Sequence, residues 1–182
     1  MASAPVRVNR APVLTLWATI VAERLGHPPD LALTLGQALA GVGARAKARR
    51  LGIAEERDRE AEKREHELRP AIRPVHLMGR DIRLLATQDG ELRADKDGKP
   101  ADAGAVRRYL QRAFGDRLTE VRAAMEAAAA RLPPEELNRV GFRLYEVFRP
   151  AVPEGVEGWG AKGELTIERI GAAVGRQGAE LM

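Results

Sequence analysis

Apolar residues recur every three or four positions through most of this 182-residue chain. This spacing is typical of helices that bury one face. The pattern is clear after Asp30, where leucines repeat at intervals of four (Leu31, Leu35, Leu39). Asp30 follows two prolines and can accept hydrogen bonds from the free amides of a first helical turn. A helix is therefore predicted to start at Asp30.

A second helix is predicted before that point, over residues 12–25. Trp17 lies in the middle of its apolar stripe, and we expect the indole to pack in the core against Leu35 or Leu39. Gly26 follows the stripe and is expected to end the helix in a left-handed backbone conformation. These two helices form the predicted N-terminal core.

Three short segments after the prolines at positions 70 and 74 have the character of strands, and a turn signal separates each from the next. They cover residues 75–78, 82–87 and 91–94. We therefore predict a mainly α (α+β) fold, a helical domain with a small antiparallel β-meander between an N-terminal and a C-terminal group of helices.

The expected domain organisation follows from these segments. A flexible arm is predicted first, and the rest is predicted to form a single domain, because the meander is too small to fold alone. The predicted ranges are 1–11 for the arm, 12–182 for the domain, 12–70 for the N-terminal helices, 75–94 for the meander and 103–175 for the C-terminal helices.

Composition limits the compartment and the partners. The chain has no cysteine, which fits a reducing compartment, and no run approaches the roughly 20 apolar residues that span a bilayer. We expect a soluble, cytoplasmic protein that does not enter a membrane. The net charge is +4, and residues 1–52 account for all of it, with seven cations (Arg7, Arg10, Arg24, Arg45, Lys47, Arg49, Arg50) against two acids (Glu23, Asp30).

Four of these cations follow two closely spaced glycines. Gly41 and Gly43 each weaken a helix by roughly 1 kcal/mol relative to alanine, so a turn or bend is predicted there. After it come four cations with no acid among them (Arg45, Lys47, Arg49, Arg50). This basic segment could contact phosphates. Alternatively, its cations are solvated and complement the negative end of the helix dipole.

Neither of two familiar DNA-binding motifs fits this segment well. Gly41-Val42-Gly43 has the shape of a helix-hairpin-helix turn, but Lys47 stands where a small residue is expected. A helix-turn-helix would need a small residue four positions before the turn glycine, and Gln37 occupies that position for Gly41. A second basic face is predicted at Arg107, Arg108 and Arg112, with a solvated surface as the alternative.

The sequence contains no recognisable catalytic arrangement. Its three histidines have no evident partners, and no serine or threonine lies in a nucleophile elbow. Asp95–Gly98 is similar to the start of a calcium loop, but the twelfth position is Val106 instead of an acid. We therefore lean against an enzyme and expect no cofactor and no metal.

Two functional hypotheses remain. The first is a non-enzymatic nucleic-acid-binding protein, such as a bacterial DNA-associated or regulatory factor. Its predicted contacts are the basic segment with help from the arm (Arg45, Lys47, Arg49, Arg50, Arg7, Arg10). The alternative is a protein-interaction module that forms homo-oligomers and has no ligand. It is suggested by the charged stretch 54–68, predicted to be helical, and by alanine-rich helix faces.

Overall fold

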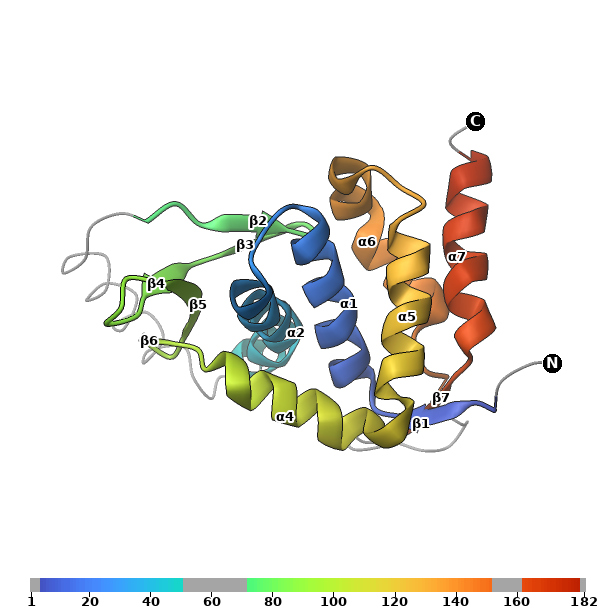
Figure 1. Ribbon diagram of the computed structural model, residues 1–182, viewed down its shortest axis with the longest axis horizontal. Coiled ribbons are helices and arrows are strands. Elements are labelled where there is room, and N and C mark those ends of the chain that lie inside the picture. The colour runs from blue at the N-terminus through green and yellow to red at the C-terminus, as the bar shows by residue number, and fades with distance from the viewer. Residues whose placement is uncertain (1–3, 51–71, 152–161, 181–182) are drawn as a thin grey trace.

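The computed structural model describes residues 4–50, 72–151 and 162–180, and it confirms the mainly helical α+β class (Figure 1). The helices of these segments are α1 (Arg10–Arg24), α2 (Pro29–Arg50), α4 (Ala103–Phe114), α5 (Leu118–Ala129), α6 (Pro134–Phe148) and α7 (Ile167–Glu180). The strands are β1 (Val6–Val8), β2 (Val75–Leu77), β3 (Arg80–Ile82), β4 (Leu84–Ala86), β5 (Leu92–Lys96), β6 (Lys99–Pro100) and β7 (Gly163–Leu165). The charged stretch 54–68 lies outside the described residues.

Helices α1 and α2 cross at very short range, and a glycine makes this possible. A Cβ atom at Gly36 of α2 would lie well under 3.0 Å from the Thr19 hydroxyl and from the Thr15 carbonyl oxygen of α1. The hydroxyls of Thr15 and Thr19 donate to carbonyl oxygens one turn earlier, at 2.9 and 2.7 Å, so both are satisfied inside the contact. The two helices can therefore meet almost backbone to backbone.

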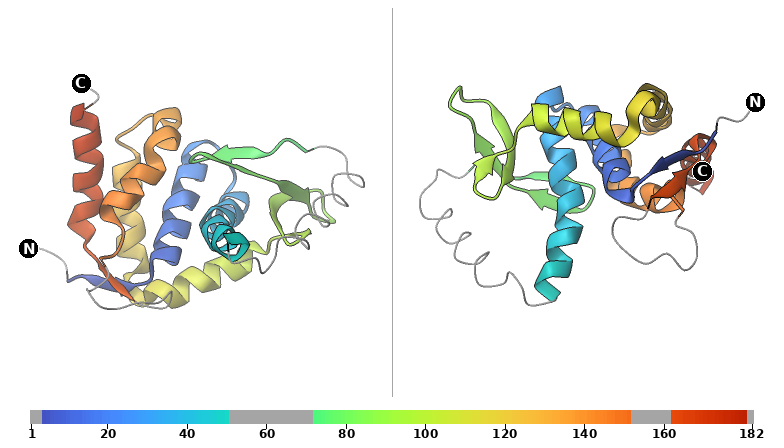
Figure 2. Two further views of the ribbon diagram at one scale, coloured as in Figure 1. Left: turned by 180° about the vertical axis from the view of Figure 1, so that it is seen from behind. Right: turned by 90° about the horizontal axis from the view of Figure 1, so that it is seen from below.

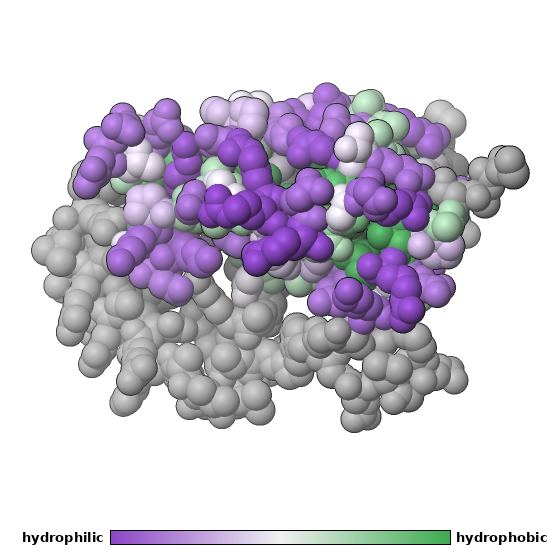
Figure 3. Space-filling model, turned by 60° about the horizontal axis from the view of Figure 1, so that its bottom comes forward, coloured by the Kyte–Doolittle hydropathy of each residue, from purple (hydrophilic) through white to green (hydrophobic). Residues whose placement is uncertain are grey.

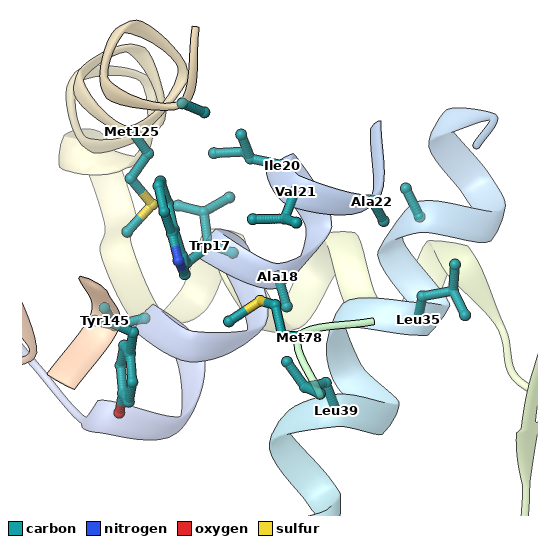
Figure 4. Packing of buried hydrophobic residues seen from close by; sticks show 14 of the residues in the cluster. Trp17, Ala18, Ile20, Val21, Ala22, Leu35, Leu39, Met78, Met125 and Tyr145 are labelled. Carbon is teal, nitrogen blue, oxygen red and sulfur yellow. The ribbon is translucent and has the colours of Figure 1, made fainter. Parts of the chain in front are cut away.

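The other side of α1 is packed by aromatic residues. Trp17 is completely buried, as predicted, but its ring meets Phe148 of α6 edge to face at 5.2 Å. Its indole Nε1 donates a 2.9 Å hydrogen bond to the Gly141 carbonyl oxygen. Figure 4 shows Trp17 turned toward Met125, with Leu35 and Leu39 on a different side of α1. The tryptophan thus joins α1 to the C-terminal helices.

The tip of the β2–β3 hairpin is held by α6. Asn138 donates to the His76 carbonyl oxygen at 3.1 Å and accepts from the Met78 amide at 2.6 Å. Met78 is buried, and Figure 4 shows it near Ala18 and Leu39. The hairpin tip therefore fills the junction between α1, α2 and α6.

The strands between residues 75 and 100 are antiparallel but form two separate sheets, β2 with β3 and β4 with β5 and β6, and their boundaries differ from those predicted. The predicted second strand is divided into β3 and β4 at Arg83, and the first turn is at Met78–Gly79. Both residues of that turn have positive φ, at 48° and 85°, which suits the twist of a two-residue hairpin. Asp97–Gly98 repeats this geometry between β5 and β6.

The arm predicted over residues 1–11 is wrong for its second half. Residues 6–8 form β1, which pairs antiparallel with β7, and α1 already begins at Arg10. Val6 and Val8 are 4% and 1% exposed and point into the core, while Arg7 faces outward. Burial of the two valines holds this segment, because alternate residues of a strand lie on the same face.

The bend predicted at Gly41–Gly43 is also wrong. Helix α2 continues through both glycines to Arg50, and Gly41 does not have a positive φ. Five alanines from position 38 to position 48 favour the helix, and packing of its first half holds the whole element in place. Together, the alanines and this packing outweigh the destabilising effect of the two glycines on the helix.

Two glycines of α2 should respond oppositely to alanine. We expect Gly36→Ala to lower the free energy of unfolding by about 1–3 kcal/mol, because the added methyl group overpacks the crossing. Gly41 has no atom within 4 Å of its Cβ position, so Gly41→Ala should raise stability by up to ~1 kcal/mol through helix propensity. Urea unfolding measures both changes. A comparable loss in both variants would contradict a continuous α2.

Candidate nucleic-acid interface

Helix α2 has a buried first half, and its second half extends away from the body of the protein. Residues on nearly all sides of the first half are buried, including Leu31, Ala32, Leu33 and Leu35, and Leu39 is 4% exposed. The helix then continues for roughly 16 Å to Arg50, at 1.5 Å per residue. Figure 2 (right) shows this end projecting from the described core. The predicted basic segment lies on this projecting end.

The first half of α2 is fixed by polar contacts as well as by packing. The Thr34 hydroxyl is fully buried, donates to the Leu31 carbonyl oxygen at 2.8 Å and accepts from the Ala94 amide of β5 at 3.0 Å. The hydroxyl thus links the helix to the edge of a strand. Thr34 and Gly36 are two positions apart and therefore lie on roughly opposite sides of α2. The helix is thus held on two sides, by α1 at Gly36 and by β5 at Thr34.

Asp30 has a different role from the helix cap that the sequence predicts. The helix begins at Pro29, and the Asp30 carboxylate pairs with Arg107 of α4 and lies 3.5 Å from Arg93 of β5. Arg93 is only 13% exposed and also binds Glu91 at 2.7 Å. These ion pairs join the start of α2 to α4 and to the sheet, and each contributes little individually because it is close to solvent.

The four cations of the basic segment occupy two faces of α2. In a helix, positions three and four apart are neighbours, so 45 and 49 share one face while 47 and 50 share another. The four cations therefore do not share one side of a continuous helix. Instead, the last turns carry positive residues at positions on both flanks.

Arg7 and Arg10 do not lie beside this end of α2. Arg7 is exposed on β1, directly opposite Glu164 of β7. Arg10 donates from Nε to the Pro150 carbonyl oxygen at 3.0 Å, and its own carbonyl oxygen accepts from the Tyr145 hydroxyl at 3.3 Å. Both panels of Figure 2 show β1 and the end of α2 well apart. Arg10 therefore ties the start of α1 to the end of α6.

The second predicted basic face does not converge with the first. Arg108 and Arg112 are exposed on α4, whereas Arg107 is occupied by Asp30 at the opposite end of α2. The 15 to 20 residues between Asp30 and the basic segment correspond to roughly 22–30 Å of helix. Figure 3 shows the face that carries α4 as broadly hydrophilic. Arg108 also has a carboxylate nearby, since Asp102 lies at 3.8 Å.

The two acids of the N-terminal region are paired with cations from other elements. Glu23 accepts from Arg122 of α5 at 2.6 Å, and Asp30 is held by Arg107 and Arg93. Burial lowers the pKa of His27, in the loop before α2, and so favours its neutral form. Neither acid is therefore available to neutralise the end of α2.

In residues 4–50, 72–151 and 162–180, no group of three or more His, Cys, Asp or Glu side chains could hold a metal ion. None of the helices in these ranges combines the length and the apolar character needed to cross a membrane.

The fold and its candidate site define a mainly helical α+β protein with a cationic helix end. Comparison with known proteins gives no family model, no curated protein and no solved structure that matches this chain.

The buried hydroxyl that holds α2 on the sheet provides a test of this anchoring. Thr34→Val keeps the shape of the side chain but leaves the buried Ala94 amide without its acceptor, so we expect a loss of about 1–3 kcal/mol in unfolding free energy. Thr34→Ser keeps the hydroxyl and should cost less. Urea unfolding and the hydrogen-exchange rate of the Ala94 amide report the difference. Slower exchange of that amide in Thr34→Val than in Thr34→Ser would contradict the assignment.

Proposed function

We propose that this protein binds nucleic acid, in a non-enzymatic role such as that of a DNA-associated or regulatory factor, through the basic last turns of α2. The observation that carries the proposal is the form of this helix: its first half is fixed in the core, and its second half projects with cations and without acids. The proposed contacts are Arg45, Lys47, Arg49 and Arg50. Arg7 and Arg10 are left out because they lie elsewhere.

Duplex DNA suits this shape better than a single strand. The major groove is about 12 Å wide and admits an α-helix, and a phosphate backbone runs along each side of it. Positions 45 and 49 can then serve one backbone while positions 47 and 50 serve the other. Single-stranded nucleic acid is usually bound by aromatic stacking platforms, and the last turns of α2 contain no aromatic residue.

The anchoring of α2 would also favour binding. A long side chain or a loop loses conformational freedom when it binds, and this loss weakens affinity. Here the backbone that carries the cations continues from a helix held by Gly36, Thr34 and Asp30. Little further ordering of that backbone is then needed at the moment of contact.

Salt dependence gives the most direct quantitative test. If the four cations each contact one phosphate, the logarithm of the binding constant should fall against the logarithm of salt with a slope of about −3.6, or roughly 12-fold for each doubling of salt. Fluorescence anisotropy with a labelled duplex measures this slope. A single-stranded probe of the same sequence should bind more weakly.

Matched variants distinguish binding through the end of α2 from binding through general surface charge. Replacing Arg45, Lys47, Arg49 and Arg50 with glutamine should abolish most of the binding and flatten the salt slope. Arg108→Gln with Arg112→Gln removes exposed cations from α4 and should leave affinity nearly unchanged. The proposal fails if wild-type protein does not bind at low salt, or if the α4 variant loses as much affinity as the α2 variant.

A further inference from the structure

Helix α6 carries an exposed stripe on the face opposite its buried one. Leu137, Val140, Leu144 and Phe148 face the core. On the other side, positions spaced four, three and four apart form one row of exposed residues, which are Glu135, Arg139, Phe142 and Glu146, and the half-buried Arg149 follows directly after the last residue of the helix. This spacing is that of the contact seam between two packed helices. Seen from behind, α6 lies at the surface beside α7 (Figure 2, left).

Phe142 is the apolar centre of this stripe. Its side chain is 41% exposed, although a phenylalanine on a helix that packs on the core would ordinarily be turned inward. One part of its ring rests on Tyr145, with ring centroids 5.8 Å apart and planes tilted by 51°. The rest of the ring faces outward, between charged positions on either side.

The charges on the stripe are antisymmetric about Phe142. Glu135 and Arg149 lie seven positions before and after it, and Arg139 and Glu146 lie three before and four after. When two copies of a helix pair antiparallel about a two-fold axis, a residue before the centre meets the residue at the corresponding distance after it. Each acid would then face a base, and the two Phe142 rings would meet.

We infer that this protein self-associates through α6, as an antiparallel helix pair centred on Phe142. A second copy is the occupant that this pattern fits, because the stripe is complementary to itself only in the antiparallel sense. In a parallel pair, every charge would face its own kind, which is destabilising. The inference does not depend on nucleic-acid binding by α2.

The charged residues of the stripe are able to make these contacts. Glu135 and Glu146 form no ion pair with any residue in the described ranges. Arg139 is paired with Glu136 one turn earlier, but its side chain is 61% exposed, and an exposed pair of this kind holds its partners weakly. Arg139 can therefore turn to Glu146 of the second copy at little cost.

The size of the contact indicates a reversible dimer. The helical part of the stripe, from Glu135 to Glu146, is roughly 16 Å long, and one helix pair of that length buries less than the ~800 Å² per partner of a standard stable complex. We expect dissociation constants on the order of 10–100 µM, so dimers should form with increasing concentration. Sedimentation equilibrium of the full chain over this range measures the constant.

Charge reversal in two separate variants tests the pairing. In the dimer, position 139 of each copy faces position 146 of the other. Arg139→Glu alone therefore places acid against acid at both of these contacts, and Glu146→Arg alone places base against base. Each should raise the dissociation constant about tenfold or more. When the two variants are mixed, the heterodimer regains opposite charges at both contacts, so association should return close to the wild-type value. Fluorescence-detected sedimentation with one labelled variant follows this directly.

Control variants test whether the loss of dimerisation is specific to the stripe on α6. Arg112→Glu on α4 changes charge by the same amount away from α6 and should dimerise like the wild type. Phe142→Ala should weaken dimerisation without a change of net charge. Circular dichroism checks that each variant is folded. The inference is overturned if the wild type remains monomeric, if either single reversal dimerises normally, or if the mixture associates no better than its components.

Discussion

The close crossing of α1 and α2 at Gly36 fixes the direction in which α2 leaves the core. A side chain at that position would separate the two helices, and the contacts that hold α2 would then have to shift together. These include the Thr34 hydrogen bond to β5 and the Asp30 ion pairs with α4 and β5. On its other side, α1 holds the C-terminal helices through Trp17. Helix α1 therefore stands between the anchor of the proposed binding helix and the rest of the fold.

Much of the fold could be predicted from local patterns, and the exceptions have physical causes. The apolar stripes predict the helices, and the C-terminal group predicted from residue 103 begins there with α4, capped by Asp102, whose carboxylate accepts from the Gly104 amide. β1 was missed because its signal is only three residues long and its partner β7 is more than 150 residues away. The bend at Gly41 was wrong because the surrounding alanines favour the helix and the first half of α2 is held by packing, and these two effects outweigh the two glycines.

The candidate site could be predicted only in part. Local composition identifies the run of cations after Gly43. Their arrangement on two faces depends on whether α2 continues through the two glycines, and composition alone does not decide this. The contacts that anchor α2 could not be predicted from local patterns, because Thr34 and Asp30 bind partners that are 60 to 77 positions away in the sequence. The stripe on α6 could have been predicted from the sequence, because it follows from helical spacing. Helical spacing places Phe142 off the apolar face formed by Leu137, Val140 and Leu144, and the assembled core leaves its side chain exposed.

The central claim is that α2 is one continuous helix whose projecting end contacts nucleic acid. It is tested most directly by nuclear magnetic resonance of the labelled protein during titration with a short DNA duplex. We expect helical carbon shifts without a break from Pro29 to Arg50, and amide shift changes that are largest over residues 43–50. Changes concentrated on α4 or α6, or a loss of helical shifts at Gly41, would contradict it.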